Sequence, residues 1–210
     1  PEEFKLRRDQ VLFMARGNPS GLQGEADTGR VDLKWFPPYN QVKKYNIYIK
    51  GPEDKKFRLA DESKSLSSTV KKLRSNTKYF FYVTAIDSAG DESMPSNEFT
   101  VVTKNILPGA PAGITISKKI SPDGKSFSVA LSWNEAVDPD GKIEAYEIWN
   151  MEGEGKLSGK VKERSYTISG LDAGKIYNYA LRAVDNKGGF SEFEKFTVSL
   201  SYHSHGELIL

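Results

Sequence analysis

The feature of this sequence that most constrains its fold is an internal repeat. Trp35 and Trp133 lie 98 positions apart, and the same spacing relates six further pairs of identical residues. In the first copy these residues are Leu73, Tyr79, Ala85, Asp87, Gly90 and Ser93, and in the second they are Leu171, Tyr177, Ala183, Asp185, Gly188 and Ser191. Identities at one constant spacing indicate two homologous units of about 98 residues.

Each copy contains short segments in which apolar and polar residues alternate. They lie at 31–35, 45–50 and 79–85 in the first copy and at 129–133, 146–148 and 177–183 in the second. Alternation with period two, rich in aromatic and β-branched residues, is typical of antiparallel strands with one buried face. Turn-forming Pro, Gly, Asp and Asn separate these segments, and no useful helical periodicity appears. About seven short strands in about 100 residues predict a β-sandwich.

The aromatic positions within each copy resemble those of a fibronectin type III domain. The first copy has Trp35, Tyr45 and then Leu73-x5-Tyr79-x-Phe81-x-Val83-x-Ala85. The second has Trp133, Tyr146 and then Leu171-x5-Tyr177-x-Tyr179-x-Leu181-x-Ala183. The resemblance covers about residues 10–200 and implies an all-β fold of two consecutive immunoglobulin-like sandwiches with seven strands each. It also implies a buried Trp on the second strand of each sandwich and a tyrosine corner, in which Tyr79 or Tyr177 bonds nearby backbone.

The resemblance implies a role without catalysis. Members of this family serve mostly as adhesion modules, receptor ectodomains or spacers attached to secreted enzymes. Residues 88–95 and 186–191, at the turns before the last strands, contain no Arg-Gly-Asp. The disulfides and the Trp-Ser-x-Trp-Ser box of cytokine receptors are missing as well, so integrin and cytokine ligands are not expected. The run at 138–148 is similar to bacterial members of the family, of the surface-protein or lipoprotein type.

The repeat also predicts the domain boundaries. We expect residues 1–104 to form the first domain, with a short charged leader at its start, and residues 112–201 to form the second. Residues 105–111 between them read as a linker whose prolines limit hinge freedom. Residues 202–210 read as a C-terminal tail.

Composition excludes several classes of function. The sequence has no cysteine, which excludes disulfides, thiol nucleophiles and cysteine-ligated zinc or iron–sulfur clusters. The formal net charge of +2 is too small to predict nucleic-acid binding. No stretch approaches the roughly 20 consecutive apolar residues of a membrane span.

Three short motifs have a chemical interpretation, and each also has a simpler structural one. His203-Ser204-His205 places two imidazoles on one side of a strand, but two ligands do not complete a zinc or copper site. Asp138-Pro139-Asp140-Gly141 offers carboxylates to calcium, yet it suits a type I turn. Gly153-Glu154-Gly155-Lys156 resembles a phosphate loop, but no helix follows it. The sequence therefore predicts no enzyme, no cofactor and no metal site.

The same alternation predicts a face for a partner. If Tyr45, Tyr79 and their alternate neighbours point into the core, the residues between them point outward. The third and sixth strands are neighbours in this fold, so the outward residues share one surface: Tyr48, Phe80, Tyr82 and Ile86, flanked by Lys44 and Lys50. The second copy offers Trp149, Ile176, Asn178, Ala180 and Arg182. Exposed aromatic clusters often mark interaction surfaces, although aromatic residues also favour strands for packing reasons alone.

We therefore expect a non-catalytic, extracytoplasmic module for protein interaction or adhesion, such as the ectodomain of a cell-envelope lipoprotein. The expected ligand is a protein or a carbohydrate and not a nucleic acid, and the expected state is a monomer without a membrane span. A lipid anchor upstream of Pro1 is compatible with this role. The alternatives are a spacer or accessory segment of a larger secreted carbohydrate-active or other hydrolytic enzyme, and an intracellular tandem-domain scaffold.

Overall fold

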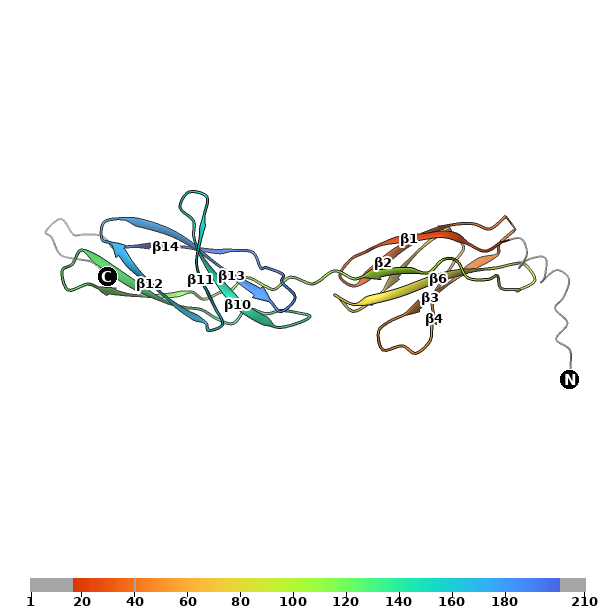
Figure 1. Cartoon of the computed structure of the whole chain (residues 1–210), viewed down its shortest axis with the longest axis horizontal. Coiled ribbons are helices and arrows are strands. Elements are labelled where there is room, and N and C mark those ends of the chain that lie inside the picture. Colours follow the sequence, from red (N-terminus) through yellow and green to blue (C-terminus); the bar gives the residue numbers. More distant parts are fainter. Residues whose placement is uncertain (1–16, 40, 201–210) are drawn as a thin grey trace. The chain divides into compact units, whose positions relative to one another are not determined.

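The computed structural model describes residues 17–39 and 41–200, and all of the regular secondary structure in these ranges is β-strand (Figure 1). The chain divides into two compact units, Pro1–Asn105 and Ile106–Leu210. In the part of the chain so described, no helix has the length and apolarity needed to cross a membrane.

The first unit is a sandwich of two antiparallel sheets. One sheet has the strand order β1-β2-β5 and the other the order β4-β3-β6-β7. The strands are β1 (Ser20–Ala26), β2 (Arg30–Phe36), β3 (Lys44–Lys50), β4 (Arg58–Ser63), β5 (Ser67–Lys71), β6 (Lys78–Ile86) and β7 (Phe99–Val102).

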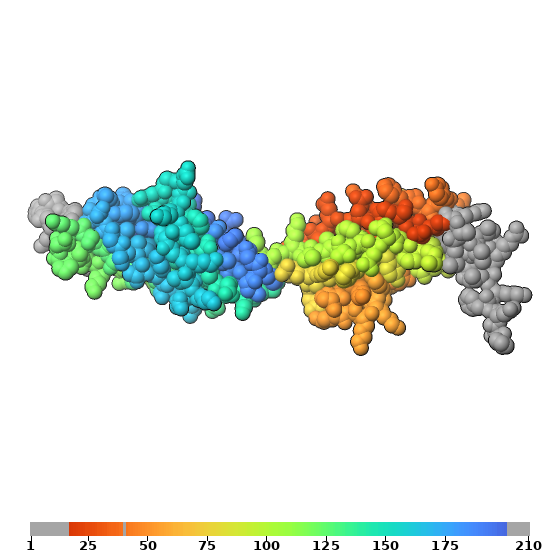
Figure 2. All heavy atoms as spheres, viewed as in Figure 1, coloured from red at the N-terminus to blue at the C-terminus, as the bar shows by residue number. Residues whose placement is uncertain are grey.

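The second unit repeats this plan. Its sheets have the orders β12-β9-β8 and β11-β10-β13-β14. The strands are β8 (Thr115–Ile120), β9 (Ser126–Ser132), β10 (Ile143–Asn150), β11 (Lys156–Val161), β12 (Ser165–Asp172), β13 (Ile176–Asp185) and β14 (Glu194–Ser199). In both units the connection between the third and fourth strands stands out from the sandwich, orange in the first and turquoise in the second (Figure 2).

Alternate residues of the central strands build each core. In β2, Val31, Leu33 and Trp35 are buried and the residues between them are exposed, as period-two patterning requires. The Trp35 ring meets Tyr45 edge-on, with centroids 5.4 Å apart at 64°. The corresponding pair in the second unit has centroids 5.4 Å apart at 66°. The predicted all-β fold of two seven-stranded sandwiches is thereby confirmed.

A tyrosine corner forms in both units. The hydroxyl of Tyr79 accepts a hydrogen bond of 3.0 Å from the backbone N–H of Arg74. The hydroxyl of Tyr177 accepts one of 2.8 Å from the N–H of Asp172. In each case the partner lies five residues upstream, so the Leu-x5-Tyr spacing places the ring where it can hold the turn before its strand.

The turn between β6 and β7 explains three of the repeated residues. Asp87 Oδ1 accepts from the N–H of Asp91 at 2.8 Å, and Gly90 takes a φ of 91°, which favours glycine. Ser93 Oγ accepts from the N–H of Ala85 at 2.9 Å and donates to the carbonyl of Met94 at 2.8 Å. The second unit makes the same Ser bonds through Ser191. Asp, Gly and Ser are therefore repeated because they fold this turn.

The chain after Asn105 is bound to loops of the second unit. The N–H of Ile106 donates to Asp140 Oδ2 at 3.3 Å, and the N–H of Gly109 donates to the carbonyl of Val137 at 2.8 Å. Pro108 and Pro111 are buried. These contacts make the residues that follow Asn105 part of the packing of the second unit.

Candidate interaction surface

Four half-buried aromatic rings lie together on the outer face of sheet β4-β3-β6-β7. We call them the aromatic face: Tyr48 of β3, Phe57 just before β4, and Phe80 and Tyr82 of β6. Tyr48 and Tyr82 are cross-strand partners whose rings stack with centroids 4.8 Å apart at 22°. The Phe57 ring packs on Tyr82 at 4.6 Å, tilted by 57°. The four rings thus lie over β3, β6 and the residue that precedes β4.

Two lysines cover one end of the aromatic face. Lys50 Nζ lies 5.8 Å from the centre of the Phe80 ring and 5.9 Å from that of Phe57. Lys78 Nζ lies 5.2 Å from the Phe80 ring. These are cation–π distances. Among the residues that the structure describes, neither lysine forms an ion pair, so both ammonium groups remain available to a partner.

A carboxylate marks the other end. The bridge between Ile86 and Glu92 brings the turn after β6 back over the sheet. Three side chains then donate to one oxygen, Glu92 Oε1: Tyr48 at 2.8 Å, Thr84 at 2.5 Å and Asn46 at 3.4 Å. Burial raises the pKa of Tyr48, and its hydrogen bond to Glu92 raises it further. The aromatic face is therefore cationic at one end and anionic at the other.

The structure brings most of the predicted face together but corrects one residue. Tyr48, Phe80, Tyr82 and Lys50 share the outer surface, as the alternation predicts. Lys44 lies beside them, where its Nζ pairs with Glu62 Oε1 at 2.5 Å. The prediction that Ile86 belongs to the exposed face is wrong, because only 8% of it is exposed. Ile86 ends β6, where the returning turn covers it.

Sequence reasoning missed four contributors to this surface. They are Phe57, Lys78 and Glu92, together with Leu59, the exposed cross-strand partner of Tyr48. Lys78 precedes Phe80 by two residues, so strict alternation along β6 is enough to predict that it lies on the same outer face. Phe57 precedes its strand and Glu92 lies in a turn, where period two has no meaning.

The equivalent face of the second unit holds an arginine of its own. Cross-strand pairing places Trp149 opposite Ala180 and Glu147 opposite Arg182. The Arg182 guanidinium carbon lies 3.9 Å from the centre of the Phe190 ring, 4.9 Å from that of Phe193 and 5.2 Å from that of Trp149. Arg182 thus fills the space among three rings.

A buried carboxylate completes this arginine site. Glu147 Oε2 accepts from Arg182 Nη2 at 2.7 Å and from the indole of Trp149 at 3.2 Å, and its Oε1 pairs with Lys160 at 3.2 Å. Burial by itself raises the pKa of Glu147, but these hydrogen bonds outweigh it and hold the pKa below its ordinary value. The predicted outward residue Trp149 is therefore half-buried in an internal network.

The remaining predicted residues of that face are divided. Ile176 and Asn178 are exposed. The expectation that Ala180 is exposed is wrong, since its accessible surface is zero. Alanine is short, and its long cross-strand neighbours Trp149 and Lys195 flank it on both sides.

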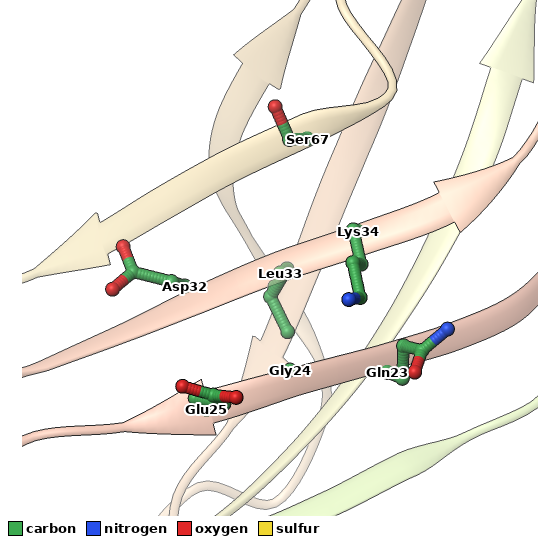
Figure 3. A pocket seen from close by; sticks show the side chains of 7 residues that line it. All are labelled: Gln23, Gly24, Glu25, Asp32, Leu33, Lys34 and Ser67. Atoms are coloured by element: carbon green, nitrogen blue, oxygen red, sulfur yellow. The ribbon is translucent and has the colours of Figure 1, made fainter.

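A depression of about 370 Å³ lies on the outer side of the other sheet of the first unit (Figure 3). It is lined by Gln23, Gly24, Glu25, Asp32, Leu33, Lys34 and Ser67. Glu25 and Asp32 are cross-strand partners of like charge, and Asp32 Oδ1 accepts from Thr69 at 2.5 Å. This polar depression has no aromatic side chain, so it offers a control region rather than a second candidate surface.

The structure provides simple roles for the motifs with a chemical interpretation. The N–H of Asp140 donates to Asp138 Oδ1 at 3.3 Å, as in a turn, and Asp140 Oδ2 pairs with Lys187 at 2.8 Å. Gly153 and Gly155 lie in a connection between two strands. His203 and His205 lie outside the described residues. Within residues 17–39 and 41–200, no three His, Asp or Glu side chains are grouped as a metal site requires.

The family model of the fibronectin type III domain matches residues 17–102 and again residues 109–198, which correspond to the two sandwiches. The chain belongs to the fibronectin type III family. A two-domain fibronectin type III segment of chicken tenascin has the same fold, with a TM-score of 0.50, 20% identity and coverage of 87% of this chain and 99% of that one. The predicted tandem fibronectin type III arrangement is confirmed.

Sequence relatives of these fibronectin type III domains include hydrolases and receptors. Exoglucanase B of Cellulomonas fimi is 33% identical over 62% of this chain, and chitinase A1 of Niallia circulans is 29% identical over 70%. Ephrin type-A receptor 5 of Gallus gallus is 32% identical over 65%. The matched regions span 12%, 20% and 14% of those three proteins, so the similarity concerns one part of each. Fibronectin type III domains are in general non-catalytic modules.

Proposed function

We propose that the chain is a non-catalytic, extracytoplasmic module that binds a protein partner through the aromatic face of its first domain. The observation that carries this proposal is the cluster of Tyr48, Phe57, Phe80 and Tyr82, with the ammonium groups of Lys50 and Lys78 at one end. Tyrosine suits an interface because its ring is apolar and its hydroxyl is polar. Relatives named as a receptor and as two polysaccharide hydrolases support a place outside the cytoplasm.

The ring geometry favours a protein over a sugar. A sugar ring stacks on a flat, uncovered aromatic face. Tyr82 already packs against Tyr48 and Phe57, and Phe80 has an ammonium group over its ring from each of two lysines. The rings of Tyr82 and Phe80 are therefore already engaged, which leaves less ring surface for a stacked sugar than an uncovered ring would.

Site-specific photo-crosslinking in cells of the source organism tests the proposal. We expect Phe80→benzoyl-phenylalanine to yield one discrete protein adduct that can be identified by mass spectrometry. Lys34→benzoyl-phenylalanine, placed in the polar depression of the other sheet, is the matched control and should yield none. With the identified protein purified, Phe80→Ser and Tyr82→Ser should each weaken binding about tenfold or more, as central aromatic contacts do.

Two results would contradict this function. Equal adducts from positions 80 and 34 would indicate non-specific contact, and unchanged affinity of both serine variants would remove the aromatic face from the interface. Binding to insoluble cellulose or chitin that both variants abolish would keep the surface but change the class of ligand to carbohydrate.

A second candidate function is that of a spacer within a secreted hydrolase. The similarity to an exoglucanase and a chitinase favours it, because in those proteins the matched part is a small share of a longer chain. A spacer needs no ligand, so both photo-crosslinking positions would then give no adduct. The same experiment therefore separates the two functions.

A further inference from the structure

The arginine site of the second domain has a counterpart in the first, where Glu92 instead of an arginine lies over the corresponding positions. The bridges Ile86–Glu92 and Val184–Phe190 occupy the same position in the two repeats, and so do the cross-strand pairs Asn46–Thr84 and Glu147–Arg182. Position 84 therefore corresponds to position 182, and Tyr48 corresponds to Trp149. The aromatic ring is present in both domains, whereas the arginine is present only in the second.

The first domain keeps a carboxylate beside this place. Where the second domain has Phe190, the first has Glu92, which is exposed and whose Oε1 is held by Tyr48, Thr84 and Asn46. Among the described residues no donor reaches the other oxygen, Glu92 Oε2. A preorganised carboxylate with one uncommitted oxygen is the partner that a guanidinium prefers.

A buried acceptor next to Glu92 also has no donor. Only 8% of Asn46 is exposed, and its Oδ1 has no hydrogen-bond partner in the described part of the chain. Its counterpart Glu147 accepts from Arg182 and Trp149. A buried polar atom without a partner carries a free-energy penalty, so this corner is less completely hydrogen-bonded than its counterpart in the second domain.

We propose that this corner of the first domain binds an arginine side chain of the protein partner, with the guanidinium against Tyr48 and paired to Glu92. The inference rests on the proposed function and names the chemistry that the aromatic face recognises. Arginine fits better than lysine because its planar group stacks on a ring and donates several hydrogen bonds in one plane. Tyr48 lies at this corner, since its hydroxyl donates to Glu92 Oε1.

NMR titration of the full ¹⁵N-labelled chain tests this inference without knowledge of the partner. The probe is Nα-acetyl-arginine N-methylamide, and the matched controls are the lysine and citrulline analogues. Citrulline has nearly the shape of arginine but no charge. We expect saturable shifts confined to the surroundings of Tyr48, Thr84 and Glu92 with the arginine probe, and markedly weaker binding of both controls.

Two variants make the assignment specific. Glu92→Gln should weaken arginine binding about tenfold, the typical effect of removing the charge from such a hydrogen-bonded pair. Thr84→Arg should fill the corner from within, as Arg182 does in the second domain, and abolish binding of the probe. Thr84→Gln, long but uncharged, is its control. Glu92 is exposed, so Glu92→Gln keeps the test decisive if Thr84→Arg does not fold.

Equal shifts with the citrulline or lysine analogue, or undiminished binding to Glu92→Gln, would overturn the inference. So would a partner whose affinity depends on Phe80 and Tyr82 but not on Glu92, although the proposed function would then stand. Conversely, arginine-specific binding without any adduct from position 80 would preserve the guanidinium corner and remove the proposed protein-binding function.

Discussion

Two carboxylates of the second domain, Glu147 and Asp138, have pKa values that are shifted in opposite directions. Glu147 lies among Arg182, Trp149 and Lys160, and its pKa is lowered. Asp138 lies near Asp140 and Asp185, and burial together with these carboxylates raises its pKa. The two groups therefore affect the pH dependence of folding with opposite signs.

We predict that Glu147 supports the second domain at neutral pH and ceases to do so in acid. A lowered pKa in the folded state stabilises the fold fully above the unfolded pKa of about 4.3, and this contribution is lost as the pH falls through the folded value. Urea unfolding between neutral and acid pH should show this loss in the wild type and not in Glu147→Gln. Glu144→Gln, an exposed glutamate of the same strand, should keep the wild-type profile.

The tyrosine corner gives a second prediction at this scale. Tyr79→Phe removes the acceptor of the Arg74 N–H and keeps the buried ring, so it should lower the free energy of unfolding of the first domain by about 1–2 kcal/mol. Tyr39→Phe changes a fully exposed ring and should have no measurable effect. Equal effects in chemical denaturation would show that the corner bond contributes nothing.

Among the secondary-structure elements, the edge strand β11 depends on a glycine. The Tyr166 ring of β12 lies over Gly159, and its hydroxyl donates to the carbonyl of Ser158 at 2.6 Å. A Cβ at position 159 would lie 2.5 Å from ring atoms of Tyr166. The missing side chain thus lets strands of opposite sheets meet at this edge.

We therefore expect Gly159→Ala to destabilise the second domain by about 1–3 kcal/mol, the usual cost of forcing a ring out of its packed position. Ser158→Ala removes an exposed side chain and leaves the accepting carbonyl, so it should be nearly neutral. Thermal unfolding of the two variants checks this, and an unaltered Gly159→Ala would mean that Tyr166 moves aside freely.

The strands could be predicted from the sequence because period two, the repeated Trp and the Leu-x5-Tyr spacing all act locally. The errors arise where local patterning stops. Alternation predicts the direction of the Ile86 side chain correctly, but the turn that follows β6 folds back over this residue and buries it. Ala180 points outward and is still buried, because its neighbours are larger. The ring of Phe57 and the carboxylate of Glu92 join the candidate surface through long-range pairing that one sequence does not reveal.

At the scale of the whole molecule, each domain has a separate hydrophobic core. The cluster around Trp35 contains residues of the first unit alone, and the cluster around Trp133 contains residues of the second. Neither core includes side chains from both units. The stability of one domain should therefore be measurable in the presence of the other.

We predict that Trp35→Ala lowers the free energy of unfolding of the first domain by about 3–5 kcal/mol, through lost burial and the cavity left behind. The second domain should unfold at its original urea concentration, as followed by NMR signals assigned to each domain. Trp133→Ala should give the converse result. A simultaneous shift of both transitions in either variant would show that the two cores fold as one cooperative unit.

The contrast between Thr84 and Arg182 has a consequence for how such a pair of domains evolves. Threonine codons ACA and ACG become arginine codons by one base change. A threonine encoded by either codon can therefore be replaced by arginine in a single mutational step, which would exchange the proposed contact with a partner for a contact within the domain. Duplication makes that exchange tolerable, because one domain can keep its internal arginine while the other binds the arginine of a partner.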